Sequence, residues 1–469
     1  MAVYWCNVAR MTIDMLPDVA LLRIFDFYVE EGQIETWQTL VHVCREWRNI
    51  IFGSPRRLDL RLLCTASTSV REKLAVWPLL PIVVLGRRGS ADNIIGALEH
   101  NDRICRLHLS SIQTSEWEKI LEAMQRPFPA LTNLYLQYGD EAMMVDPNSF
   151  LGGSAPSLQR LVLDSIPFPG LPKLLMSATH LVDLCLHSIP HSGYIPPREM
   201  LIALSTLTRL KYLRIEFESP SRPVQKSLLP FPLTRTLLPV LTRFRFQGTD
   251  KYLEDLVAQI DAPLLDYMRI IFFYQPTFDT PQLTQLISRT PKFKAQDRAR
   301  VAFSDWDAWV TLPQTSSGRV SLGISGRQPD WQLWSLMQIC STYFPRDLIS
   351  AVEHLYILKG LMLRVLQHDT FEWSRWLDLF YQFTAVKSLY ISREFAPCIA
   401  PALQVLAGEE GLMEVLPALQ TLFFEETLPL GPVEEAIGKF VAARQLAGHP
   451  IAVSHWEGMK DVLDDEFGV

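Results

Sequence analysis

The apolar residues of the chain return in a six-position pattern, Leu-x-x-Leu-x-Leu, in which other large apolar residues often replace leucine. Seven copies begin 27, 27, 23, 29, 31 and 24 residues apart, at Ile104, Leu131, Leu158, Leu181, Leu210, Leu241 and Leu265. Three more begin 34 and 33 residues apart, at Val352, Val386 and Leu419. Alternating apolar positions predict a short strand in each copy, and segments with helical spacing, such as REMLIALSTL from Arg198, lie between copies. The pattern therefore predicts a series of strand and helix units.

Units of this length determine the fold, because a single strand and helix cannot bury their own apolar faces and must stack on their neighbours. The period is typical of leucine-rich repeats. We therefore predict an α/β fold in which an irregular leucine-rich-repeat solenoid forms a curved parallel sheet with outer helices. Irregularity is expected because the Asn or Cys that usually follows the pattern is replaced, by Ile112, Ile166, Ile189, Glu218 or Gly139. Between Phe272 and Ala351 the pattern is blurred, and an unrelated α/β fold with ordinary buried strands is the alternative.

The stretch before these repeats predicts a separate helical module. In LPDVALLRIF, Pro17 suits the first position of a helix and Asp18 places negative charge at its positive end. A second helix is predicted from Trp37 to Phe52, with Gly53 after it. Both helices carry wider apolar surfaces than some fifty residues can enclose, so the excess should be covered by the next domain, by another protein, or by both.

The order of residues in this module resembles the F-box motif. The resemblance rests on Leu16-Pro17, the apolar LLRIF at 21–25, Val43-Cys44-Arg45-Glu46-Trp47 and Ile50; Asp18 stands where the family often has Glu. It implies a three-helix module that docks on the Skp-type adaptor of SCF ubiquitin ligases and, through it, on a cullin scaffold. The adaptor-binding residues that it implies are Leu16, Pro17, Leu21, Leu22, Ile24, Phe25, Val43 and Trp47. The alternative is a plain helical cap on the solenoid.

As a whole, the chain is similar to the large fungal family of F-box proteins with irregular solenoids. We expect an F-box-like helical module at 12–58, a connector and first solenoid cap at 59–100, the solenoid at 101–430, and a C-terminal helix and acidic tail at 431–469.

Composition narrows the class of partner. The formal net charge of −7 argues against general affinity for nucleic acid or acidic membrane, which requires clustered Lys and Arg. The 7 cysteines are odd in number and widely spaced, which fits reduced residues of a cytoplasmic or nuclear protein better than a disulfide framework. No apolar run reaches the length of a membrane span.

No catalytic motif stands out, so we expect neither an enzyme nor a cofactor; an enzyme with a scattered active site is the remaining rival. The sequence has no Walker loop, GxSxG elbow or HExxH motif. His187 and His191 are four residues apart but flank Pro190, and no third metal ligand is evident. Tryptophan pairs such as Trp306 with Trp309, which could suggest an aromatic ligand cage, are interpreted as core or lateral packing of helices.

The residue between the last two apolar positions of each copy should point out of the concave face, because strand side chains alternate. In order these residues are His108, Tyr135, Val162, Cys185, Arg214, Arg245, Arg269, Tyr356, Tyr390 and Phe423. The three arginines, with Arg243 on the same face and Glu216 as a partial neutraliser, predict a basic stripe; ordinary solvated charge is the alternative. The candidate target-binding residues are Tyr135, Arg214, Arg243, Arg245, Arg269, Tyr356 and Tyr390.

These predictions together describe a substrate receptor of an SCF-type ubiquitin ligase, with the target, acidic or phosphorylated, held on the concave face. The alternative is a leucine-rich-repeat binding scaffold that assembles no ligase.

Overall fold

The structure is a computed structural model that describes residues 16–31, 36–53, 60–77, 79–138, 149–168, 170–220, 235–273, 280–294, 296–313, 318–326, 328–360, 373–407, 414–425 and 431–457. The chain divides into two compact units, Met1–Leu181 and Val182–Val469. Each unit is described by itself below.

The first unit begins with three helices that pack on one another: α1 (Asp18–Glu31), α2 (Thr36–Val43) and α3 (Arg45–Gly53). The single helix expected from Trp37 to Phe52 is therefore two helices, divided at Cys44. The thiol sulfur of Cys44 accepts a hydrogen bond from the backbone N–H of Trp47 at 3.3 Å, the contact by which a capping side chain satisfies the start of a helix. Arg48 also donates from Nε to the Val41 carbonyl at 2.9 Å, which ties the start of α3 to the end of α2.

A parallel sheet follows in the same unit. Its strands are β1 (Leu60–Leu63), β2 (Ile82–Arg87), β3 (Ile104–Ser110), β4 (Asn133–Gln137) and β5 (Arg160–Asp164). The connecting helices are α4 (Val70–Val76), α5 (Ala91–Leu98), α6 (Thr114–Ala123) and α7 (Leu171–Leu175), with a 3-10 turn η2 (Phe150–Gly153). Leu107, Leu134 and Leu161 are direct partners on β3, β4 and β5, so successive copies of the sequence pattern lie in register.

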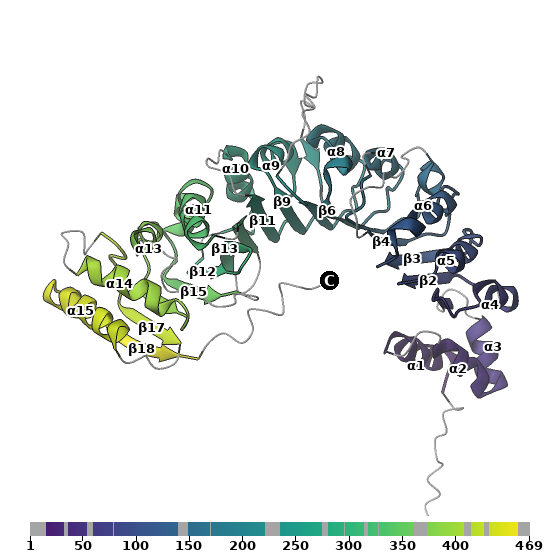
Figure 1. Cartoon of the computed structure of the whole chain (residues 1–469), viewed down its shortest axis with the longest axis horizontal. Helices are drawn as coiled ribbons and strands as arrows, with labels where there is room; N and C mark the ends of the chain where they lie inside the picture. The colour runs from purple at the N-terminus through teal and green to yellow at the C-terminus, as the bar shows by residue number, and fades with distance from the viewer. Residues whose placement is uncertain are drawn as a thin grey trace, which may run out of the picture. The chain divides into compact units, whose positions relative to one another are not determined.

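The second unit continues this architecture over a longer sheet (Figure 1). Its strands are β6 (Asp183–Ile189), β7 (Tyr212–Phe217), β9 (Arg243–Gly248), β11 (Tyr267–Phe273), β12 (Arg298–Phe303), β13 (Asp307–Pro313), β14 (Arg319–Ser325), β15 (His354–Lys359), β16 (Ser388–Ile391), β17 (Thr421–Glu425) and β18 (Ala452–Trp456). Two short strands, β8 (Thr236–Leu237) and β10 (Ile260–Asp261), form a separate parallel pair. The helices are η3 (His191–Gly193), α8 (Pro197–Leu204), α9 (Asp250–Val257), α10 (Pro281–Arg289), α11 (Pro329–Thr342), α12 (Arg346–Ile349), α13 (Trp373–Phe380), α14 (Ala396–Leu406) and α15 (Pro432–Leu446).

Strand order explains why the repeat pattern is blurred after Phe272. The order runs β11-β14-β13-β12-β15, in which β13 is antiparallel to both neighbours while β14 and β12 are parallel to the strands outside them. After α10 the chain therefore passes over two strand positions and returns by a hairpin. β13 and β14 are buried on both faces over five consecutive residues, so their sequences lack the alternation that marks the other copies.

The main core lies between the sheet and the helices, which cover one face of the second unit's sheet (Figure 1). Strand residues that point to this core, such as Leu213, Phe244 and Met268, are buried, and they pair in register across β7, β9 and β11. The other side of the sheet, called the helix-free face below, is the concave face expected from the sequence. The predicted fold class is confirmed: an all-α module followed by an irregular solenoid with a mostly parallel, curved sheet and outer helices.

A tight turn after several strands accounts for the missing Asn or Cys of the repeat. Ser111, Ser165 and Ser188 have positive φ of 54°, 58° and 46°, and each directly follows or nearly ends its strand. The next residue in each case, Ile112, Ile166 or Ile189, is buried. An apolar side chain therefore closes these turns where a polar one usually bonds the backbone.

Strands also occur in segments for which the sequence predicted none. β1 and β2 lie within the expected connector and cap at 59–100, and β18 pairs in parallel with β17 after the expected C-terminal helix. The acidic tail, at Asp461, Asp464, Asp465 and Glu466, lies outside the described residues.

Candidate binding surfaces

The helical module separates its apolar residues into a core and a surface. Leu21, Leu22 and Phe25 are buried, together with Leu40, Val41 and Ile51 from the other two helices. Phe25 packs on Trp47 with ring centroids 4.7 Å apart. Three of the eight predicted adaptor-binding residues, Leu21, Leu22 and Phe25, are therefore core residues of the module.

The other side of the same helices exposes apolar residues. Val19 and Phe27 on α1 are each 61% exposed and Val43 on α2 is 56% exposed. Ile24 is 43% exposed and by helical spacing lies beside Phe27. We call this set the module surface; its members are Pro17, Val19, Ile24, Phe27, Val43 and Phe52, all of them exposed.

Polar groups adjoin the module surface. An open pocket is lined by Asp18, Arg45, Glu46, Asn49, Ile50 and Gly53. Leu16 is half-buried at the start of α1, and Trp47 is half-buried at its contact with Phe25.

In the second unit, residues that pair across successive strands form a continuous row on the helix-free face. The row runs Cys185, Arg214, Arg245, Arg269, Ser321, Thr311, Arg300, Tyr356, Tyr390, Phe423 and Ser454. The predicted alignment of Arg214, Arg245 and Arg269 is thus present in the strand register.

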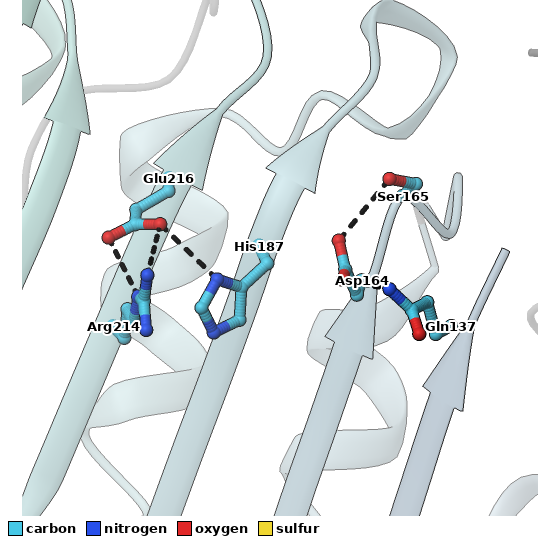
Figure 2. A network of polar contacts seen from close by, with 6 residues as sticks. All are labelled: Gln137, Asp164, Ser165, His187, Arg214 and Glu216. Carbon is cyan, nitrogen blue, oxygen red and sulfur yellow. Dashed lines mark hydrogen bonds and ion pairs between the residues drawn. The ribbon is translucent and has the colours of Figure 1, made fainter. Parts of the chain in front are cut away.

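Figure 2 shows that the Arg214 guanidinium is hydrogen-bonded within the chain, to the carboxylate of Glu216. Its Nε and Nη2 donate to the two carboxylate oxygens of Glu216 at 2.7 and 2.8 Å. Nδ1 of His187 lies 3.2 Å from Oε2 of the same carboxylate. Glu216 therefore neutralises Arg214, as the sequence suggested in part. The main contact of Arg214 is this internal ion pair rather than a partner. The same carboxylate is the partner of His187, which was considered as a metal ligand from its spacing in the sequence.

The Glu216 carboxylate is strongly stabilised in its charged form. Burial is the largest single influence and raises its pKa, but the hydrogen bonds from His187 and Arg214 outweigh burial and lower the pKa of Glu216 to about 2. Burial likewise lowers the pKa of Arg214, yet the bond to Glu216 raises that pKa above its ordinary value overall. The two directions agree, so the pair remains ionic over the whole physiological pH range.

The remaining arginines of the row rest on aromatic rings. The guanidinium carbon of Arg245 lies 5.1 Å from the Tyr267 ring centroid, and that of Arg269 lies 5.3 Å from the Trp309 centroid. Stacking orients a guanidinium while its N–H edge stays available for an anion. Arg243 is exposed at the same face, one row along β9.

Sequence reasoning missed further members of this face because they lie on β12–β14, where the pattern is blurred. Arg298 and Arg300 on β12 and Arg319 on β14 alternate with buried Ala299, Val301 and Val320. Trp309, which was expected in the core or in lateral packing of helices, is buried on strand β13 in a core cluster with Ala302, Tyr356 and Leu358 on the helix-free face. Recognising three short consecutive strands between 298 and 325 could have revealed these residues.

Aromatic rings continue the row beyond Arg300. Tyr356 and Tyr390 stack with centroids 4.2 Å apart at an angle of 11°, and Tyr390 and Phe423 stack at 4.4 Å and 5°. Trp456 meets Tyr390 edge-on at 5.6 Å. We call Tyr356, Tyr390 and Phe423, with Trp456 beside them, the aromatic ladder.

Tyr135, the one predicted target-binding residue of the first unit, stacks on His108 with centroids 4.1 Å apart. Burial, and to a lesser extent the Asp164 carboxylate, raise the pKa of Tyr135. Asp164 itself accepts hydrogen bonds from Gln137 at 3.0 Å and from the hydroxyl of Ser165 at 3.3 Å (Figure 2). Polar contacts within the chain therefore engage this part of the first unit's sheet.

Metal and membrane chemistry find no support in the described ranges. No three His, Cys, Asp or Glu side chains gather there to hold a metal ion, and His191 lies near Ser219, with its Nε2 3.5 Å from the hydroxyl. None of the helices in the same ranges has the length and apolarity needed to cross a bilayer.

The similarity of the chain to known proteins is remote. No family model matches the chain, and no curated protein is significantly similar to it. One similar solved structure is the TLR13–ssRNA13 complex, with 12% identity over 78% of this chain and 46% of that chain and a TM-score of 0.32. Another is the leucine-rich repeat-containing protein LegL7 from Legionella pneumophila, with 12% identity over 82% of this chain and 97% of that chain and a TM-score of 0.28. The chain thus spans less than half of the TLR13 chain, at 46%.

The strand register and the one-sided helices define the class of protein: an irregular leucine-rich-repeat solenoid with a helical module at its N-terminal end. The candidate binding surfaces of the described chain are the module surface and the arginines and aromatic rings of the helix-free face.

Proposed function

We propose that the chain is the substrate receptor of an SCF-type ubiquitin ligase. The helical module binds the Skp-type adaptor, and through it the cullin scaffold, while the helix-free face of the solenoid binds a target protein. The observation that carries the proposal is the module surface, since it combines the residue order of an F-box with apolar side chains that nothing in the described chain covers.

The exposure of Val19, Phe27 and Val43 weighs against the plain cap. A helical cap exists to cover the apolar end of a solenoid, so its own apolar residues should be buried by the repeat next to it. These residues are instead more than half exposed within the unit that contains both the module and the first repeats. An apolar patch on one small module is the usual mark of a docking site for another protein.

Within the predicted adaptor site, we distinguish residues that would contact the adaptor from residues that would support the module. We assign direct contact with the adaptor to Pro17, Ile24 and Val43, joined by Val19 and Phe27, because their side chains are exposed. Leu21, Leu22 and Phe25 would act indirectly, by holding α1 against the other two helices.

Target binding would increase the local concentration of the target near the ubiquitin-loaded enzyme recruited by the scaffold, so the chain itself would supply proximity and no chemistry. An anionic target, acidic or phosphorylated, suits Arg243, Arg245 and Arg269, because charge-assisted hydrogen bonds to arginine are the strong ones.

Co-purification with a Skp-type adaptor tests the proposal. The variant to compare with wild type is Ile24→Asp with Val43→Asp, which places charge in the module surface without removing a core side chain. A matched control changes Val76→Asp and Leu79→Asp, which are 81% and 88% exposed but lie outside the module.

We expect adaptor binding by wild type and by the control, and loss of binding by the module variant, with all three proteins melting at the same temperature. Lack of binding by wild type would contradict the ligase role and favour the scaffold alternative. Equal binding by the module variant would place the adaptor site elsewhere.

A further inference from the structure

The arginines of the helix-free face form two adjacent rows, larger than the stripe expected from the sequence. One row contains Arg245, Arg269 and Arg300, which are linked through Ser321 and Thr311 by direct strand pairing. The other, two residues earlier on the same strands, contains Arg243, Arg319 and Arg298. We call these six residues the arginine rows.

Within the strands that carry the arginine rows, arginines outnumber carboxylates on the helix-free face. At the helix-free positions of the described strands β9, β11, β12, β13 and β14, Asp307 is the single carboxylate. Asp307, at the start of β13, accepts from the Ser304 hydroxyl, and Asp266 pairs with Lys292 at 3.3 Å. Asp297, just before β12, lies 3.9 Å from Nε of Arg298. In a chain of net charge −7, such a local concentration of arginine indicates an anionic partner.

The guanidinium groups are held in place before any partner binds. Arg245 and Arg269 lie over the rings of Tyr267 and Trp309, and Nε of Arg245 is buried without a hydrogen-bond partner in the described structure. A buried donor without an acceptor costs free energy until an acceptor arrives. An oxyanion at this position would supply one.

The chemistry of the face changes abruptly after Arg300. Its direct partner on β15 is Tyr356, the first ring of the aromatic ladder. Tyr356 also belongs to the apolar cluster around Trp309, against which Tyr390 and Trp456 pack. The helix-free face therefore offers an anion-binding half and an apolar half along one line of strands.

We propose that this face binds an extended peptide segment that carries anionic side chains at one end and aromatic or apolar side chains at the other. The segment crosses the strands, with its anionic end on the arginine rows and its apolar end on the aromatic ladder. This inference deepens the proposed target-binding role and rests on it, but it does not depend on adaptor binding.

The dimensions of the surface suit a single extended chain. The two arginine rows are two residues apart on each strand, which corresponds to about 7 Å, the width of one peptide rather than of a globular surface. From Arg269 to Tyr390 the path crosses β14, β13, β12 and β15 before it reaches β16. At about 4.8 Å per strand this is about 24 Å, which about seven extended residues span.

The aromatic ladder favours a peptide over a single-stranded nucleic acid. Bases bind such surfaces by stacking on exposed ring faces. Here the faces of Tyr356, Tyr390 and Phe423 stack on one another, while Arg245 and Arg269 cover those of Tyr267 and Trp309. The ring edges that remain suit side chains that pack rather than bases that stack.

Fluorescence anisotropy with the purified full-length chain tests the proposal. The probe is a labelled peptide with a pair of phosphoserines, about six alternating glycine and serine residues as a spacer, and then tryptophan and phenylalanine. A second probe replaces the phosphoserines with glutamates, which separates phosphorylated from merely acidic targets. Further probes shorten the spacer to about two residues, omit the aromatic pair, or are an oligouridine RNA.

The variants remove one half of the surface at a time. Arg245→Gln with Arg269→Gln removes stacked charges, and Arg245→Lys with Arg269→Lys keeps the charge but not the planar donor edge. Tyr390→Ser with Phe423→Ser removes two rings of the aromatic ladder. The matched control, Lys251→Gln with Lys439→Gln, removes the same charge from exposed positions on helices α9 and α15.

We expect the bipartite probe to bind, its affinity to fall with added salt, and the Arg-to-Gln pair to weaken it at least tenfold while the lysine control does not. The ring variant should weaken only probes that carry the aromatic pair, and a shortened spacer should cost as much as omission of that pair. The Arg-to-Lys pair should also weaken binding of the bipartite probe, although this variant should melt at the same temperature as wild type.

Absence of binding by both anionic probes, or equal loss in the lysine control, overturns the proposal. Indifference to spacer length or to the aromatic pair overturns its bipartite form. If the RNA binds more tightly than any peptide, the ligand of this face is a nucleic acid and the peptide proposal is wrong. Adaptor binding is measured in a separate co-purification experiment. None of these outcomes therefore tests whether the helical module binds the adaptor.

Discussion

Replacement of Glu216 by Gln tests the internal electrostatics of the second unit most directly. The carboxylate accepts two hydrogen bonds from Arg214 and lies 3.2 Å from a ring nitrogen of His187. Its side chain is only 18% exposed, so solvent screens these contacts weakly. Gln keeps the shape of the side chain but removes the charge. One carboxylate oxygen becomes an amide NH2 group, which faces the N–H donors of Arg214 and cannot accept a hydrogen bond from them.

The expected loss follows from the pKa of the carboxyl. Hydrogen bonds from His187 and Arg214 outweigh burial and lower the pKa of Glu216 from 4.5 to about 2. A depression of this size corresponds to about 3 kcal/mol of stabilisation at neutral pH. The folded pKa lies below the unfolded one, so this stabilisation is complete above the unfolded pKa and is lost as the pH falls toward 2. At pH 3.5 about 2 kcal/mol should remain.

Urea unfolding followed by circular dichroism at pH 7 and pH 3.5 measures the difference between wild type and Glu216→Gln. The control is Glu353→Gln: Glu353 accepts from Lys387 at 2.7 Å, but both side chains are more than two-fifths exposed, and such pairs contribute little. We expect a clear loss for Glu216→Gln that is smaller at pH 3.5, and no measurable loss for the control. Equal midpoints for the two variants at pH 7, or a loss that does not change with pH, would refute the reasoning.

Other predictions concern packing and reactivity. A Cβ at Gly323 would lie 2.7 Å from the Ala308 carbonyl oxygen, so Gly323→Ala should lower the free energy of unfolding by about 1 to 3 kcal/mol in a urea titration, while Gly326→Ala, with open space around it, should not. Trp376 is fully buried, and Trp376→Ala should cost about 3 to 5 kcal/mol by the same measurement; a loss below 1 kcal/mol would show that the site collapses. Burial raises the pKa of the Cys340 thiol well above its usual range, so iodoacetamide should label it at pH 8 only as fast as the protein unfolds, as mass spectrometry would detect; rapid labelling of the native protein contradicts this.

The repeats could be predicted because each copy alternates between a buried face and a solvated face. Leu355, Leu389 and Leu422 came from three separate copies of the sequence pattern, and they are direct partners on β15, β16 and β17. The same alternation placed Arg245 and Arg269 on one face before any pairing was known. Local periodicity was sufficient for these features because it reflects which side of a strand meets the helices.

The hairpin of β12, β13 and β14 could not be predicted in the same way. β13 and β14 are buried on both faces over five consecutive residues, so periodicity disappears there, and sequence order no longer gives order in the sheet. The contribution of Arg298, Arg300, Arg319 and Trp309 to the helix-free face was missed for this reason.

By itself the sequence determined the repeat period, the parallel strands that follow from it, and the apolar excess of the helical module. Only the tertiary structure decided which residues of that excess form a core: Leu21, Leu22 and Phe25 are buried by neighbouring helices, while Val19 and Phe27 are exposed. It also decided that Glu216 neutralises Arg214, whereas Arg245 rests on a ring. A sequence states which side chains are apolar or charged; which of them meet depends on contacts between distant segments.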